Sequence, residues 1–123
     1  MKNLSRNAEV KELRIKTVEG KALHGNVVMK PLMAGDQMTL LEIQYAPGAG
    51  APLHVHQHET LAYVVSGKVK MWVGKEEYLL SAGDVCKHPQ GVPHGVEGVE
   101  QALVLEIKSP AQPIEQFLGT SEK

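Results

Sequence analysis

Three of the six histidines in this chain stand within five residues, at positions 54, 56 and 58, and His94 follows further along. Side chains two positions apart on an extended segment point to the same side, so the imidazoles of His54 and His56 can converge on one ion. Imidazole nitrogens favour divalent transition metals such as Zn, Fe, Ni, Cu or Mn over Mg or Ca. The pair therefore indicates a metal site, and the alternative is a set of surface histidines in a polar loop.

Two motifs with regular spacing surround these histidines, and their defining positions are Gly48, His54, His56, Thr60 and Gly67 in the first and Gly83, Pro89, Gly91, His94 and Gly98 in the second. In order and separation they resemble the two motifs of the cupin superfamily, except at Thr60. The resemblance implies an all-β fold, a single-domain jelly-roll-like β-barrel. It also implies that His54, His56 and His94 project into the barrel and bind one divalent transition metal per chain, either Fe, Zn, Ni or Mn.

Thr60 stands where the family usually carries a fourth ligand, most often Glu. A neutral hydroxyl is a poor metal ligand, so we expect Thr60 to bind weakly, through water, or not at all. His58 shares strand parity with His54 and His56 and is a possible replacement, although a turn after His56 would place it beside the metal or at the surface. Glu59 should point to the other side of its strand.

A three-histidine site leaves the full +2 charge on the ion, which favours carboxylate or enolate substrates. Because this donor set resembles that of diketone and thiol dioxygenases, the leading hypothesis is an enzyme, dioxygenase-like if the metal is iron, that acts on a small oxygen-rich molecule. The tail resembles that of the ring-opening cupins of pectin degradation, which suggests instead a metal-assisted isomerase or lyase on unsaturated uronates. Glu115 and Phe117 would then stand for their catalytic carboxylate and aromatic residue. The third hypothesis is a non-catalytic cupin that binds a small ligand.

Further residues are candidates for the pocket. Cys86 and His88 alternate with Val85 and Lys87 along the strand that enters the second motif, so both are expected to face the cavity of His94. His88 would then be a candidate acid or base, and the alternative is a hydrogen-bonded core histidine beside a buried thiol. The remaining pocket candidates are Gln44, Met38 and Phe117.

Short segments rich in Val, Leu, Ile and Tyr recur every eight to twelve residues between Gly, Pro, Asp or Asn turns, which is typical of antiparallel barrels. This rhythm predicts strands over residues 24–31, 38–46, 60–66, 68–73, 76–80, 84–88, 94–97 and 102–108. We expect an N-terminal arm or edge strand over 1–20, the barrel over 21–110, and a tail over 111–123 that packs on the barrel, with a helical turn at 114–118. The exposed barrel edges and the polar arm predict a homodimer.

Composition narrows the choice of partners. The chain has 123 residues and a formal net charge of -1, so nothing in its charge favours nucleic acid. No apolar run approaches the ~20 residues that span a bilayer, and the first twenty residues lack the apolar centre of a secretory signal. Cys86 is the single cysteine, which suits a reducing compartment. We therefore expect a cytoplasmic protein with a small-molecule substrate and without membrane or nucleic-acid partners.

Overall fold

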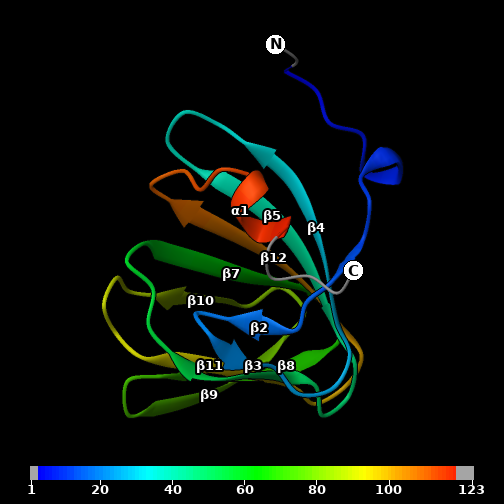
Figure 1. The fold of residues 1–123 in the computed structure, drawn as a ribbon. Helices are drawn as coiled ribbons and strands as arrows, with labels where there is room; N and C mark the ends of the chain where they lie inside the picture. Colours follow the sequence, from blue (N-terminus) through cyan, green and yellow to red (C-terminus); the bar gives the residue numbers. More distant parts are fainter. Residues whose placement is uncertain (1–2, 119–123) are drawn as a thin grey trace.

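A computed structural model describes residues 3–118, with side chains up to residue 116. Two antiparallel sheets face each other, as Figure 1 shows. The larger sheet has the strand order β1-β4-β5-β12-β7-β10 and the smaller β6-β11-β8-β9. Their strands are β1 (Leu13–Arg14), β4 (Val27–Ala34), β5 (Thr39–Tyr45), β6 (Gly50–His54), β7 (Glu59–Ser66), β8 (Lys68–Val73), β9 (Glu76–Ser81), β10 (Val85–His88), β11 (His94–Gly98) and β12 (Ala102–Ser109). The predicted all-β barrel is confirmed.

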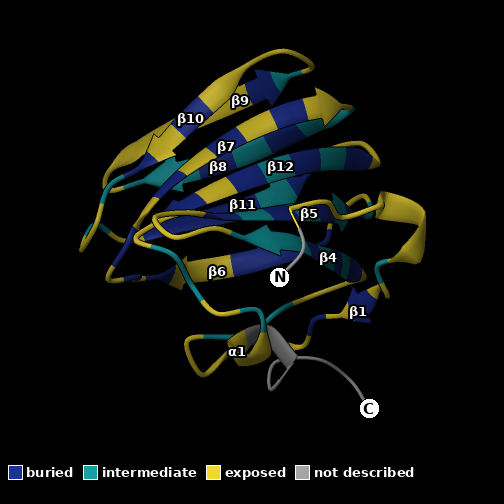
Figure 2. Cartoon of the chain, turned by 90° about the horizontal axis from the view of Figure 1, so that it is seen from above, coloured by how far each residue is buried: buried dark blue, intermediate teal, exposed yellow. Residues whose placement is uncertain are grey.

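Burial alternates along the strands of the larger sheet, as the stripes in Figure 2 show. The inward residues of β12 change character along the strand. Val104 lies opposite Val64 of β7 in the apolar core, whereas Lys108 lies opposite Thr60. The interior is therefore aliphatic towards one end of this strand and polar towards the other.

Strand β6 is absent from the strands predicted from the sequence, which gave this segment as extended only. Its first residues, Gly50 and Ala51, are both buried, so the usual alternation is broken. A Cβ atom on Gly50 would lie 1.9 Å from the carbonyl oxygen of Val96 in β11. Glycine lets the two strands approach closely at this point, and the approach places His54, the last residue of β6, opposite His94.

The N-terminal residues, for which an arm or edge strand was predicted, include both an edge strand and a separate hairpin. A 3-10 turn, η1 (Asn7–Glu9), is followed by β1, which pairs with β4 at the edge of the larger sheet. A two-stranded hairpin of β2 (Thr17–Val18) and β3 (Lys21–Ala22) comes next, and it was not among the predicted elements. In Figure 1 this hairpin lies between the two sheets.

The C-terminal tail returns to the larger sheet. The hydroxyl of Thr39 on β5 donates to the carbonyl of Gln112 at 2.7 Å and accepts from its N–H at 2.7 Å. Helix α1 (Glu115–Leu118) then begins where the sequence predicted a helical turn. In the part of the chain that the structure describes, no helix is long and apolar enough to cross a membrane.

Candidate metal centre

His54, His56 and His94 come together at one end of the barrel interior. Their ligand atoms lie within 4.8 Å of one another, and their ring centroids are 4.3 to 5.1 Å apart. Strand pairing places His54 opposite His94. His56 follows two residues after β6, and its carbonyl accepts the N–H of Gly91 at 2.9 Å, which ties its loop to the turn before His94. The clustering predicted for these three histidines is present.

The hydrogen bonds of the three rings assign their tautomers. Nδ1 of His54 lies 2.7 Å from the carbonyl oxygen of Pro52, and Nδ1 of His94 lies 3.3 Å from that of Val92. Nδ1 of His56 lies 3.1 Å from the carboxylate of Glu19. Since each partner is an acceptor, each Nδ1 carries the proton, and all three Nε2 lone pairs remain for a ligand. Three such donors fit one divalent transition metal.

The three histidines are also neutral. Burial is the main cause in each case, and it lowers the pKa of His94 to about 3 and that of His56 to about 2. The nearby Lys108 ammonium lowers the pKa of His56 further, and burial likewise lowers that of His54. A metal would therefore not compete with protons for these nitrogens near neutral pH.

Two further histidines line the same cavity. His58 is buried and stacks on His56 at 4.4 Å, and burial lowers its pKa to about 4. Its Nε2 has no hydrogen-bond partner among the described residues. His88 stacks on His94 at 4.4 Å, and its Nε2 lies 3.4 Å from Sδ of Met71. The structure thus places His58 in the interior beside the three histidines, not at the surface.

Thr60 does not face an open ligand position. It is buried, and its hydroxyl accepts a hydrogen bond at 3.2 Å from Nζ of Lys108, the residue opposite it on β12. Lys108 also forms a 3.2 Å ion pair with Glu106, and both side chains are about nine-tenths buried. A lysine ammonium therefore lies where the sequence motif led us to look for a fourth ligand.

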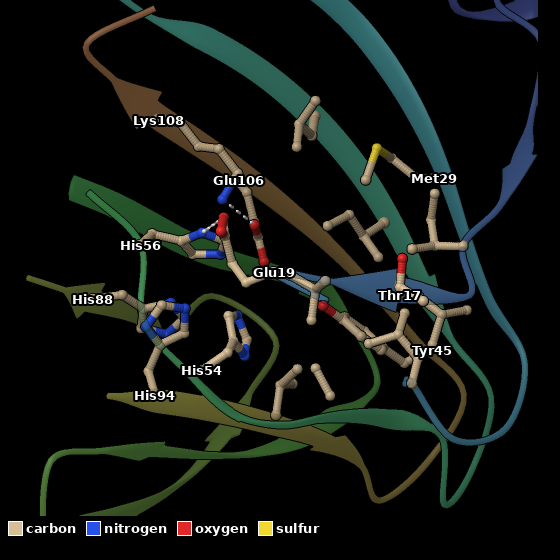
Figure 3. Close-up of a pocket in the computed structure, with 18 of the residues that line it drawn as sticks. Thr17, Glu19, Met29, Tyr45, His54, His56, His88, His94, Glu106 and Lys108 are labelled. Atoms are coloured by element: carbon tan, nitrogen blue, oxygen red, sulfur yellow. Dashed lines mark hydrogen bonds and ion pairs between the residues drawn. The ribbon is translucent and has the colours of Figure 1, made fainter. Parts of the chain in front are cut away.

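Glu106 and Lys108 were not among the site residues predicted from the sequence. Burial by itself would raise the pKa of Glu106, but the charge and hydrogen bond of Lys108 oppose it, and the pKa lies below its usual value. The available signal for them was a pair of charged residues at alternate positions of β12, on the same face as the apolar Ala102 and Val104. Figure 3 shows this ion pair next to His56.

The histidines open into a cavity of about 140 Å³ with two chemically different ends. One end carries the five histidines, Glu106 and Lys108. The other end is mainly aliphatic, lined by Ile15, Val18, Leu23, Val27, Met29, Leu41, Ile43, Ala51 and Val96. Tyr45 also lines the cavity, and its pKa is raised, chiefly by burial.

Several predicted pocket residues lie elsewhere. Gln44 projects from β5 on the face opposite to its cavity-lining neighbours, because β5 alternates. Met38 is exposed before β5, and Cys86 is buried in the apolar core without lining the cavity. Glu115 is exposed at the start of α1, while its neighbour Gln116 does line the cavity. The side chain of Phe117 lies outside the described residues.

Comparisons with known proteins agree on one family. The model of the cupin domain matches residues 41–108. Quercetin 2,3-dioxygenase of Bacillus subtilis (strain 168) is 37% identical over 62 residues, which are 49% of this chain and only 18% of that protein. The pectin degradation protein KdgF of Dickeya dadantii (strain 3937) is 27% identical over 84 residues, 68% of this chain and 76% of that protein.

The fold has a solved counterpart of the same size. The structure of KdgF from Halomonas sp. matches with a TM-score of 0.76 and 23% sequence identity, over 94% of this chain and 99% of that chain. At this identity the likeness concerns the fold alone.

Proposed function

Because the chain belongs to the cupin family, we propose that it is a metal-dependent enzyme in which His54, His56 and His94 bind one divalent transition metal beside a small-substrate cavity. One observation carries this proposal. All three histidines are buried and neutral, and each has its Nδ1 engaged by an acceptor, which leaves three Nε2 atoms for one ion. Three unprotonated nitrogens held within 4.8 Å of one another form a preorganised donor set for one transition metal.

When bound, a divalent metal would supply Lewis acidity, and iron would in addition supply chemistry with dioxygen. The chain's own residues would do the rest. Contacts with Thr60 and Glu106 use two of the three ammonium hydrogens of Lys108, so a third can bind an anionic oxygen of the substrate. His58 stacks its neutral ring on His56 and so helps to hold that ligand's imidazole in place.

The size of the cavity and its aliphatic end limit the size and polarity of the substrate. A cavity of about 140 Å³ holds a molecule of roughly the size of benzene. The histidine and lysine end suits an enolate or carboxylate group, whereas side chains such as Val27, Met29 and Ile43 suit an apolar body. We therefore propose a small amphipathic substrate, and a dioxygenase-like reaction if the metal is iron. The partial likeness to quercetin 2,3-dioxygenase supports this choice.

A metal-assisted isomerase or lyase on unsaturated uronates is the second candidate, and the likeness to the pectin degradation protein favours it. Two features count against it. Sugar hydroxyls would face the aliphatic side chains without hydrogen-bond partners, and Glu115 is exposed and does not line the cavity. A non-catalytic cupin that binds a small ligand is the third hypothesis, and the same metal and cavity would serve it.

The test begins with metal analysis of untagged protein, followed by oxygen uptake with small enolisable and thiol compounds under iron loading. We expect stoichiometric metal in the wild type and less than a tenth of it in His94→Gln. His24→Gln changes an exposed histidine outside the cluster and is the matched control. A protein that takes up no transition metal would refute the proposed centre, and an iron-loaded protein inert to oxygen would refute the dioxygenase version. Ring opening of an unsaturated uronate would establish the second candidate.

A further inference from the structure

We propose that Glu19 is the positioning residue for His56, and that metal binding at the three histidines holds the β2–β3 hairpin closed over the cavity. The inference rests on the proposed function in one respect, since it requires that the histidines bind a metal. It adds a residue from outside both sequence motifs and a conformational consequence.

The hydrogen bonding of His56 differs from that of the other two histidines. His54 and His94 each use the carbonyl of the residue two positions earlier in the sequence. His56 instead uses the carboxylate of Glu19, 37 residues away in sequence. Its ring orientation and tautomer therefore depend on a remote segment, and carboxylates that bind metal-ligating histidines in this way orient the ring and raise its basicity.

The backbone conformation of the turn at Glu19 is unfavourable for a residue with a side chain. Glu19 has a φ of 48° and is the only non-glycine residue with positive φ in the range 3–118, and Gly20 follows with a φ of 76°. Two positive φ values in a two-residue hairpin loop are typical of Asn-Gly or Gly-Gly sequences. A glutamate at the first position has a backbone cost, and in the structure its side chain reaches His56, as Figure 3 shows.

The same hairpin covers the cavity. Thr17, Val18 and Glu19 line it, together with Leu23 just after the hairpin. Among residues 3–118 the hairpin pairs only within itself. It is held to β6 by the hydrogen bond from Lys21 Nζ to the carbonyl of Leu53 at 2.9 Å and by bridge bonds of His24 with Gly50. A short element with so few hydrogen bonds to the sheets is the part of the fold expected to open first.

These contacts couple metal binding to closure of the hairpin. Opening of the hairpin withdraws the carboxylate from His56, so a metal that needs His56 oriented binds the closed state more tightly. By thermodynamic reciprocity, the metal then stabilises the closed hairpin to the same extent. Substrate would enter when the hairpin opens, and its closure would shield the site from water.

The test uses Co²⁺ as the probe, titrated into the metal-free full chain against a competing chelator and followed by its visible absorption. Glu19→Gly removes the carboxylate and puts at this φ the residue that tolerates it, so the turn is not destabilised. Glu19→Gln keeps an acceptor oxygen without the charge. Glu76→Ala removes an exposed carboxylate from β9 and is the control.

We expect Glu19→Gly to weaken Co²⁺ binding 10- to 100-fold, Glu19→Gln to fall between it and the wild type, and Glu76→Ala to bind normally. Hydrogen exchange by mass spectrometry supplies a second measurement. Co²⁺ should slow exchange of residues 17–22 in the wild type and in Glu76→Ala but not in Glu19→Gly. Wild-type affinity and hairpin protection in Glu19→Gly would overturn this inference alone. Absence of Co²⁺ binding in the wild type would overturn both this inference and the proposed metal centre.

Discussion

The buried neutral histidines predict that the metal-free protein loses stability steeply below pH 6.5. Burial lowers the pKa of His58 to about 4, of His94 to about 3 and of His56 to about 2. In the unfolded chain each histidine titrates near pH 6.5. As the pH falls through 6.5, the unfolded state therefore takes up protons that the folded state does not, and the free energy of unfolding decreases.

The size of the effect follows from linkage. A histidine that stays neutral in the folded state and titrates at about 6.5 in the unfolded state costs about 2 kcal/mol of stability between pH 7 and pH 5. His56, His58 and His94 together give about 6 kcal/mol by the same relation. His54 and His88 act in the same direction, because burial lowers their pKa values as well. The sum rivals the whole stability of a typical domain, about 5–15 kcal/mol.

The assay is urea denaturation of the metal-free protein at pH 7, 6 and 5, followed by circular dichroism. Replacing one member of the cluster, as in His94→Gln, should remove about 2 kcal/mol of the difference between pH 7 and pH 5. His24→Gln, at an exposed position outside the cluster, is the matched control. A free energy of unfolding that is flat over this range would show that the histidines are not buried in neutral form, and the argument for their readiness to bind metal would fail with it.

Three other predictions concern stability and assembly. Lys108→Met should destabilise the protein by about 3–5 kcal/mol, because Glu106 is left buried without its partner. Adding Glu106→Leu should restore most of that loss, as measured by urea denaturation. Equal stability of the single and double variants would contradict this prediction. Gly50→Ala should lower the free energy of unfolding by more than about 4 kcal/mol or prevent folding, because its Cβ would collide with the Val96 carbonyl. Gly35→Ala is the control, since its Cβ meets only an ordinary contact at 3.4 Å. Equal thermal midpoints for the two variants would refute the clash. Sedimentation equilibrium should give twice the chain mass if the predicted homodimer forms, and a monomer mass at all concentrations would exclude it.

The outer face of β7 and β10 is relevant to that last prediction. Leu61, Tyr63, Val65 and Val85 are exposed there, and strand pairing places Tyr63 directly opposite Val85. A contiguous apolar surface of this kind suits contact with another protein surface, including a second copy.

For strand β12, the sequence alone did not predict which face is buried. Its alternation defined two faces, one with Leu103, Leu105 and Ile107 and the other ending in Glu106 and Lys108. Hydrophobicity alone would turn the leucines inward, yet the structure buries the charged pair and leaves Ile107 exposed. Which face is inward depends on the register with β5 and β7, and a strand's own sequence does not contain that register.

Period-two alternation and glycine turns are local properties of the chain, and they predicted an antiparallel barrel. The resemblance of the two motifs to those of cupins implied that His54, His56 and His94 would meet inside it. The tertiary structure decided what surrounds them. It brought Glu19 from a hairpin with no recognisable motif to His56, and it set Lys108 beside Thr60. Such contacts join segments that are far apart in the chain, so they exist only once the sheets have paired and closed over the interior.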